Sequence, residues 1–142
     1  MIVASTAKNL GLGTILARFA VAHVIANERP WHYKREIISH IHESNDAPRG
    51  VFARSWFTFV GKETVPEEHA PASMKRNAEG KLVGDKFLFP RTAVPELSKW
   101  LNEEFNGRLR DGTAIVIDLP PAGLAGLRSA LLEEIQDIAA AE

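Results

Sequence analysis

The apolar residues repeat with two different patterns along the chain, and this change of pattern restricts the folds open to it. Near both ends they recur three or four positions apart, as on one face of a helix. This spacing predicts helices over residues 14–27, with Thr14 as N-cap, over 94–106 and over 124–138. Tyr33, Ile37 and Ile41 are also four apart, and they predict a further helix over residues 31–43.

The middle of the chain has a strand-like composition instead. Residues 51–60 are dense in aromatic and β-branched side chains, and short strands are predicted at 81–83 and 86–89, around Gly84 and Asp85, and at 113–119. Helices and strands mix without regular alternation, which is typical of an α+β protein. We expect a single small domain over residues 1–142. It would have N-terminal helices, a short, mostly antiparallel sheet with C-terminal helices packed on it, a flexible start at 1–13 and an irregular loop at 61–79.

The chain contains no cysteine, which excludes disulfides, thiolate catalysis, zinc–thiolate sites and iron–sulfur clusters. A cysteine-free chain fits a reducing compartment, so a cytoplasmic location is predicted. Residues 10–26 are rich in apolar side chains, but Arg18 and His23 interrupt them. A signal peptide or a membrane-spanning helix is therefore not expected, and no membrane partner is predicted.

Cations and aromatic rings gather in one stretch of the sequence. Residues 1–62 hold eight Lys/Arg and four Asp/Glu, whereas residues 63–142 hold nine and fourteen, and residues 29–62 hold six of the eleven aromatics. Rings interleaved with cations can stack on bases and neutralise phosphates. The predicted contact residues are Trp31, Lys34, Arg35, Arg49, Arg54 and Trp56.

This basic stretch predicts a non-enzymatic protein that binds a macromolecule, either nucleic acid or a ribonucleoprotein complex. On the predicted strand over 51–60, Arg54 and Trp56 share one face, while Phe57 and Phe59 face the other way, toward the core. The alternative for the whole stretch is that its rings fill the core and its charges are only solvated.

An acidic C-terminal part supports a second hypothesis from a different class. Its carboxylates are Glu96, Glu103, Glu104, Glu133, Glu134, Asp137 and Glu142. Such a face could bind a basic groove, as in a small protein-binding inhibitor or adaptor of the kind that mobile elements encode against a host protein complex. A charge run of this kind is more often simply the solvated side of a helix.

Catalysis and metal binding receive little support from the sequence. Glu67, His69 and Asp118 could serve a hydrolase, the weakest of the three hypotheses, but no nucleophile motif or Gly-Lys-Ser/Thr tripeptide of a phosphate-binding loop accompanies them. His40 and His42 are two apart, which would place them on nearly opposite faces of a helix. We therefore predict no metal site and no cofactor. The oligomeric state stays open, and no motif identifies a known family.

Overall fold

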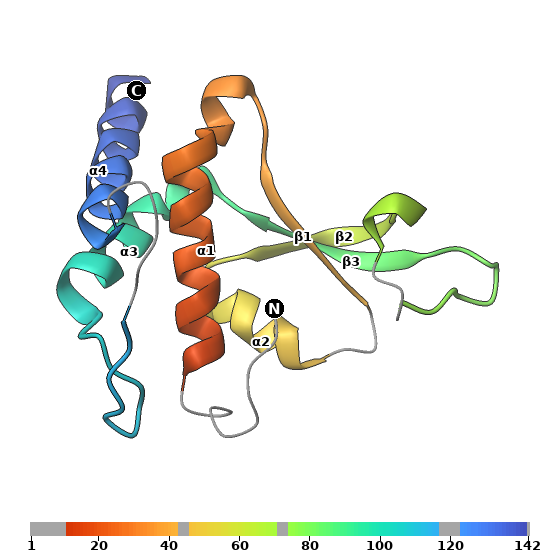
Figure 1. Cartoon of the computed structure of the whole chain (residues 1–142). Helices are drawn as coiled ribbons and strands as arrows, with labels where there is room; N and C mark the ends of the chain where they lie inside the picture. The colour runs from red at the N-terminus through yellow and green to blue at the C-terminus, as the bar shows by residue number, and fades with distance from the viewer. Residues whose placement is uncertain (1–10, 43–45, 71–73, 117–122, 142) are drawn as a thin grey trace. The chain divides into compact units, whose positions relative to one another are not determined.

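The computed structural model describes residues 11–42, 46–70, 74–116 and 123–141 (Figure 1). These residues form four helices and a three-stranded antiparallel sheet, with helices toward both ends of the chain, which confirms the predicted α+β class. The helices are α1 (Leu12–Glu28), α2 (Asp46–Arg54), α3 (Val94–Lys99) and α4 (Gly123–Ala141), and the strands are β1 (Ile37–His42), β2 (Thr58–Thr64) and β3 (Val83–Phe89). Among the described helices, none has the length and hydrophobicity that crossing a membrane requires.

Backbone contacts divide the chain into two compact units, which are described separately below. The sheet unit is Glu36–Pro90, and the helical unit comprises the chain before and after it. The single domain over 1–142, and the packing of the C-terminal helices on the sheet, stay predictions.

The helical unit is built from α1, α3 and α4, where α4 lies along both α1 and α3 (Figure 1). The predicted helix near the start is confirmed, although it begins at Leu12 after the left-handed Gly11. Phe19 packs edge-on against Trp100, with ring centroids 5.6 Å apart. From α4, Leu127 and Leu131 of the predicted apolar stripe are fully buried. The predicted helix over 94–106 is also present, as α3 continued by a π-helical turn, Trp100–Glu104.

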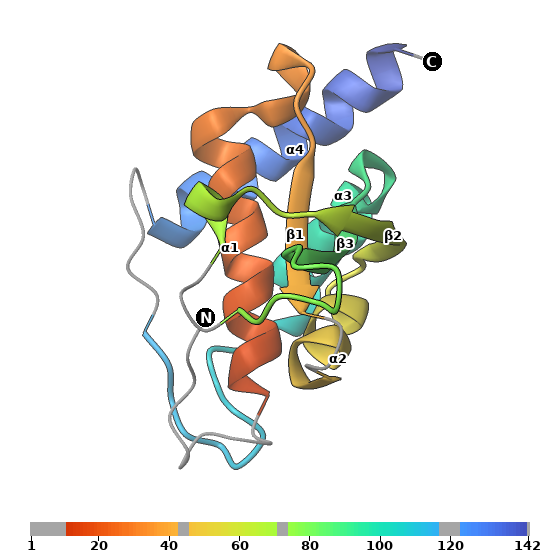
Figure 2. The ribbon, with the colours of Figure 1, turned by 90° about the vertical axis from the view of Figure 1, so that its right-hand side faces the viewer.

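In the sheet unit the strands lie in the order β1-β3-β2, and both neighbours run antiparallel to β3 (Figure 2). Phe87 and Phe89 point to the face on which α2 lies, since Phe52 of α2 stacks on Phe87 at 6.1 Å. Phe57 packs toward this cluster, 5.6 Å from Phe89, as predicted, although the residue is only half-buried. Phe59, by contrast, is 53% exposed, and its predicted burial is wrong.

Two predicted elements in the first half are wrong. In place of the predicted helix over 31–43, the described residues form a one-turn 3-10 helix, Pro30–Tyr33, followed by β1, because Lys34 takes a left-handed conformation (φ 55°) that ends the helix. The isoleucines of this segment then pair along β3, as Ile37 does with Phe89. Residues 51–60 are not one strand either: α2 runs to Arg54, Trp56 turns the chain with φ 66°, and β2 begins at Thr58.

Two further strand predictions need correction. The two short strands around Gly84 and Asp85 are one continuous strand, β3, since both residues pair with β1 and β2. Its partner β2 extends to Thr64, into the loop predicted at 61–79. Residues 113–116 make a single bridge, between Arg108 and Ala114, instead of a buried strand, and residues 117–119 lie outside the described part.

Candidate functional site

The six predicted contact residues are divided between the two units. Trp31, Lys34 and Arg35 lie at the end of the 3-10 turn in the helical unit, and Arg49, Arg54 and Trp56 lie in or just after α2 in the sheet unit. The prediction that Lys34 and Arg35 lie near the start of a long helix is therefore wrong. Arg54 ends α2 and Trp56 occupies the turn after it, so they do not share a strand face. That the two groups together form one binding surface stays a prediction.

Arg49 serves the interior of the sheet unit. Its Nη2 donates a hydrogen bond to Oδ2 of Asp85, a β3 residue that is only 5% exposed. The guanidinium also lies 5.8 Å from the ring centre of Phe87. On the other side, Lys62 Nζ is 3.4 Å from Oδ1 of Asp85. These contacts tie α2 and β2 to the central strand, so Arg49 has a structural role that a purely solvated cation would not have.

The environment of Asp85 changes its acidity. Burial alone would raise the pKa of this carboxyl, but the hydrogen bond and charge of Arg49, followed by those of Lys62, outweigh it and hold the pKa below its usual value. The charged carboxylate is therefore part of the folded state.

We expect stability to fall as the pH drops below about 4, the ordinary pKa of an aspartate. The unfolded state takes up the Asp85 proton first, so this contribution is complete above the unfolded pKa and is lost as the pH falls through the lower, folded-state pKa. Denaturant titrations of the wild type and of Asp85→Asn, made from pH 7 to pH 2, measure how the free energy of unfolding changes with pH.

The variant lacks this titration, so its stability should depend less steeply on pH than that of the wild type. The pKa values of Glu63 and Asp111 are also lowered, and both carboxyls remain in the variant, so the difference between the two proteins isolates Asp85. Equal slopes for the two proteins would contradict the assignment.

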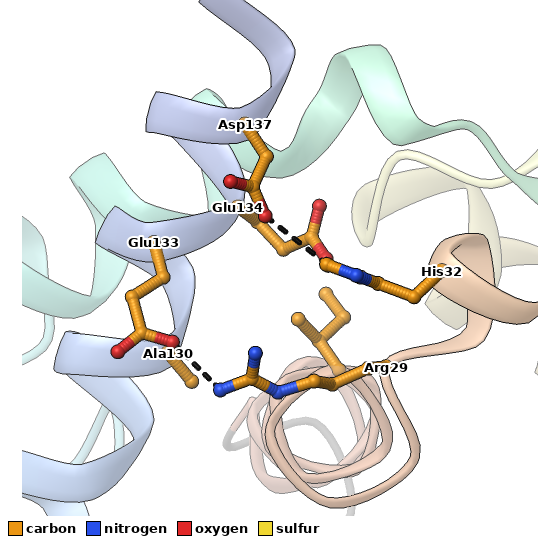
Figure 3. A pocket seen from close by; sticks show the side chains of 7 residues that line it. Arg29, His32, Ala130, Glu133, Glu134 and Asp137 are labelled. Carbon is orange, nitrogen blue, oxygen red and sulfur yellow. Dashed lines mark hydrogen bonds and ion pairs between the residues drawn. The ribbon is translucent and has the colours of Figure 1, made fainter. Parts of the chain in front are cut away.

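In the helical unit, His32 lies against two carboxylates of α4 (Figure 3). Its Nε2 is 3.1 Å from Oδ2 of Asp137 and 3.4 Å from Oε1 of Glu134. The Glu134 side chain is only 4% exposed, and Arg91 donates two hydrogen bonds to its Oε2, from Nε at 3.2 Å and from Nη2 at 3.0 Å. The Arg91 guanidinium in turn lies 5.9 Å from the ring centre of Trp31. This cluster holds the 3-10 turn against α4.

The same contacts engage three carboxylates of the predicted acidic face. Glu133 accepts a hydrogen bond from Arg29 at 2.8 Å, while Glu134 and Asp137 are bound as described above (Figure 3). Three of the carboxylates proposed for a basic partner are thus engaged within the chain. The protein-binding hypothesis loses part of its support as a result.

The basic tip, which we define as Tyr33, Lys34 and Arg35, is exposed. The Tyr33 residue is 69% exposed, and sequence reasoning did not single it out as a contact residue. Neither cation pairs with a carboxylate among the described residues. The backbone is nevertheless fixed, because Arg35 N–H donates to the carbonyl of the buried Pro30 at 2.9 Å. A ring and two cations thus project from an ordered turn.

Of the three residues proposed for a hydrolase, the structure describes only the side chain of Glu67. Glu67 is on the surface, 71% exposed, and its carboxylate accepts a hydrogen bond from Arg76. The His69 side chain and Asp118 lie outside the described part of the chain.

On β1, Nε2 of His40 is buried and lies 3.5 Å from Oε1 of Glu63, without forming a hydrogen bond to it.

Comparison with known proteins adds no family. The chain matches no family model, and neither the curated proteins nor the solved structures include a significant match to it.

Proposed function

We propose that the chain is a non-enzymatic binding protein for single-stranded nucleic acid, free or within a ribonucleoprotein complex, and that the basic tip makes the contact. The observation that carries this proposal is the exposure of Tyr33 beside Lys34 and Arg35. A base stacked on an aromatic ring contributes about 1–3 kcal/mol, and neighbouring cations neutralise the backbone. A duplex hides the faces of its bases, so an exposed ring favours single strands.

The order of the turn adds to this argument. Pro30 is buried, Trp31 packs beside Arg91, and Lys34 N–H donates to the carbonyl of Trp31 at 3.3 Å. A contact surface that is already ordered loses less conformational entropy when it binds. The tip can therefore present its side chains without first folding around a ligand.

The predicted contact surface changes in consequence. Arg49 bonds to Asp85 beneath α2, so we remove it from the nucleic-acid surface. Arg54 is exposed at the end of α2 and stays in the proposal together with the half-buried Trp56. Any contribution of Arg54 and Trp56 to nucleic-acid binding is separate from the contribution of the basic tip.

Tyr33→Ala is expected to weaken binding to a single-stranded oligonucleotide by about tenfold or more, which corresponds to the loss of one stacked base. Tyr33→Phe keeps the ring and should bind nearly as well as the wild type. The double variant Lys34→Ala/Arg35→Ala should reduce the slope of log K against log salt by about 1.4, or about 0.7 for each phosphate contact. Fluorescence anisotropy over a salt series measures all three.

The matched control is Lys75→Ala/Lys81→Ala, which removes two exposed cations from the sheet unit. It changes the net charge equally and should leave the slope close to that of the wild type. Absence of binding at low salt would contradict the proposal. If a pull-down then recovered a protein partner, the inhibitor or adaptor hypothesis would replace it.

A further inference from the structure

The cluster around His32 places three metal-ligating atoms close together. Nε2 of His32, one carboxylate oxygen of Glu134 and one of Asp137 all lie within 4.8 Å of one another (Figure 3). The imidazole nitrogen faces Oδ2 of Asp137 at 3.1 Å and Oε1 of Glu134 at 3.4 Å. A single N–H can point well at only one of these oxygens, whereas a cation between the three atoms would satisfy both carboxylates and the nitrogen.

Arg91 orients the buried member of the trio. Its two hydrogen bonds fix Oε2 of Glu134 and leave Oε1 directed to His32. A hydrogen bond from a second residue to a ligating carboxylate is how metal sites commonly hold their ligands in place. The 96% buried side chain of Glu134 thus has one oxygen held by the protein and the other turned toward the opening lined by His32 and Asp137.

We propose that His32, Glu134 and Asp137 bind a zinc ion. Zinc binds imidazole nitrogen and carboxylate oxygen at about 2.0–2.2 Å, so tetrahedral ligand atoms lie about 3.4 Å apart, close to the two separations measured here. An imidazole ligand favours zinc over calcium or magnesium, which prefer oxygen ligands alone. His32 and Asp137 are 40% and 46% exposed, so water can fill the fourth position.

The charge of the surroundings is compatible with a dication. Three carboxylates, on Glu133, Glu134 and Asp137, stand against the guanidiniums of Arg29 and Arg91, which leaves one negative charge when His32 is neutral. The sequence did not predict this site, because His32 and Asp137 are separated by most of the chain. Its only local signal is the three-residue spacing of Glu134 and Asp137 on α4.

Zinc titration of the full-length chain, stripped of metal by a chelator, tests the proposal by isothermal calorimetry. We expect saturable one-to-one binding in the wild type. His32→Ala and Asp137→Ala should each weaken it by at least about tenfold, because even the loss of a residue that only orients a ligand costs 10–100-fold in affinity. Cobalt provides a second probe, since tetrahedral coordination would give visible absorption that both variants lose.

Two matched variants serve as controls. Glu96→Ala removes an exposed carboxylate of α3 that does not line this pocket, and His40→Ala removes a β1 histidine that faces Glu63. Both should bind zinc like the wild type, and circular dichroism checks that every variant is folded. If the wild type binds no zinc, the cluster is an ion-pair network only. If folded His32→Ala and Asp137→Ala bind as tightly as the wild type, the ion lies elsewhere. Either result overturns the proposal.

Discussion

Asp85→Ala is expected to lower the free energy of unfolding by about 3 kcal/mol. Removing one member of a buried ion pair costs about 3–5 kcal/mol, because the partner charge is left uncompensated. Arg49 and Lys62 keep side-chain exposures of 27% and 56%, so water can solvate them in part, which places the expected loss at the lower end. Denaturant unfolding at pH 7 measures it.

A matched surface pair provides the control. Arg76 and Glu67 are also joined by a hydrogen bond, but their side chains are 53% and 71% exposed. Glu67→Ala should therefore cost at most about 1 kcal/mol. If Asp85→Ala cost no more than this control, the buried pair would not be an important link between α2 and β3.

A compensating double variant separates charge from packing. Arg49→Met/Asp85→Leu replaces the ionic pair by apolar side chains of similar size, and it should be more stable than Asp85→Ala, because the charge of Arg49 is then no longer left next to an empty position. Lys62 is the remaining cation near this position, and at 56% side-chain exposure it can turn toward solvent. A double variant less stable than Asp85→Ala would contradict this explanation.

The sequence predicted the helices at both ends well, because each helix follows an apolar stripe with little local competition. In α4, Leu127 and Leu131 have helical spacing and are both fully buried. In α1, Phe19 and Ala22 are buried as their spacing indicated. Such stripes depend on neighbours within a few residues, which a single sequence displays directly.

In the middle of the chain, helix and strand were exchanged for a physical reason. The four-residue spacing of Ile37 and Ile41 fits one helix face, but it equally fits one face of a strand, where every second residue points the same way. β-Branched isoleucine favours the strand once β3 offers a partner. Conversely, Phe52 resembled a strand residue, although it lies on α2 and stacks on Phe87.

The candidate sites depended on pairings that no local pattern contains. In the sequence Arg49 resembles any other exposed cation, whereas in the structure it donates a hydrogen bond to Asp85 of β3. His32 contacts Glu134 and Asp137 on α4, which lie about a hundred residues further along the chain. Exposure of a side chain such as Tyr33 likewise depends on the whole fold, so the basic tip could be recognised in the sequence only as part of a longer basic stretch.

Phe89→Ala is expected to lower the free energy of unfolding by about 3–5 kcal/mol, the usual cost of truncating a buried phenylalanine. Phe89 is 1% exposed in the core of the sheet unit. Leu101→Ala is the counterpart in the helical unit, where Leu101 is fully buried, with an expected cost of about 2–5 kcal/mol. Chemical denaturation gives both values.

Hydrogen exchange in these two variants also tests the predicted single domain. The chain leaves the helical unit after Arg35 and returns to it at Arg91. The sheet unit is therefore an insertion between the two segments of the helical unit, which have to associate for that unit to fold. If the sheet unfolded alone, the helical unit would have to close a long disordered loop, at an entropic cost. The sheet unit is also small, and a unit of that size buries a limited share of its surface. We therefore expect the two units to unfold together, so Phe89→Ala should reduce amide protection in α1 and α4 as well as in β3. Loss of protection confined to β1, β2 and β3 would instead indicate two independent domains.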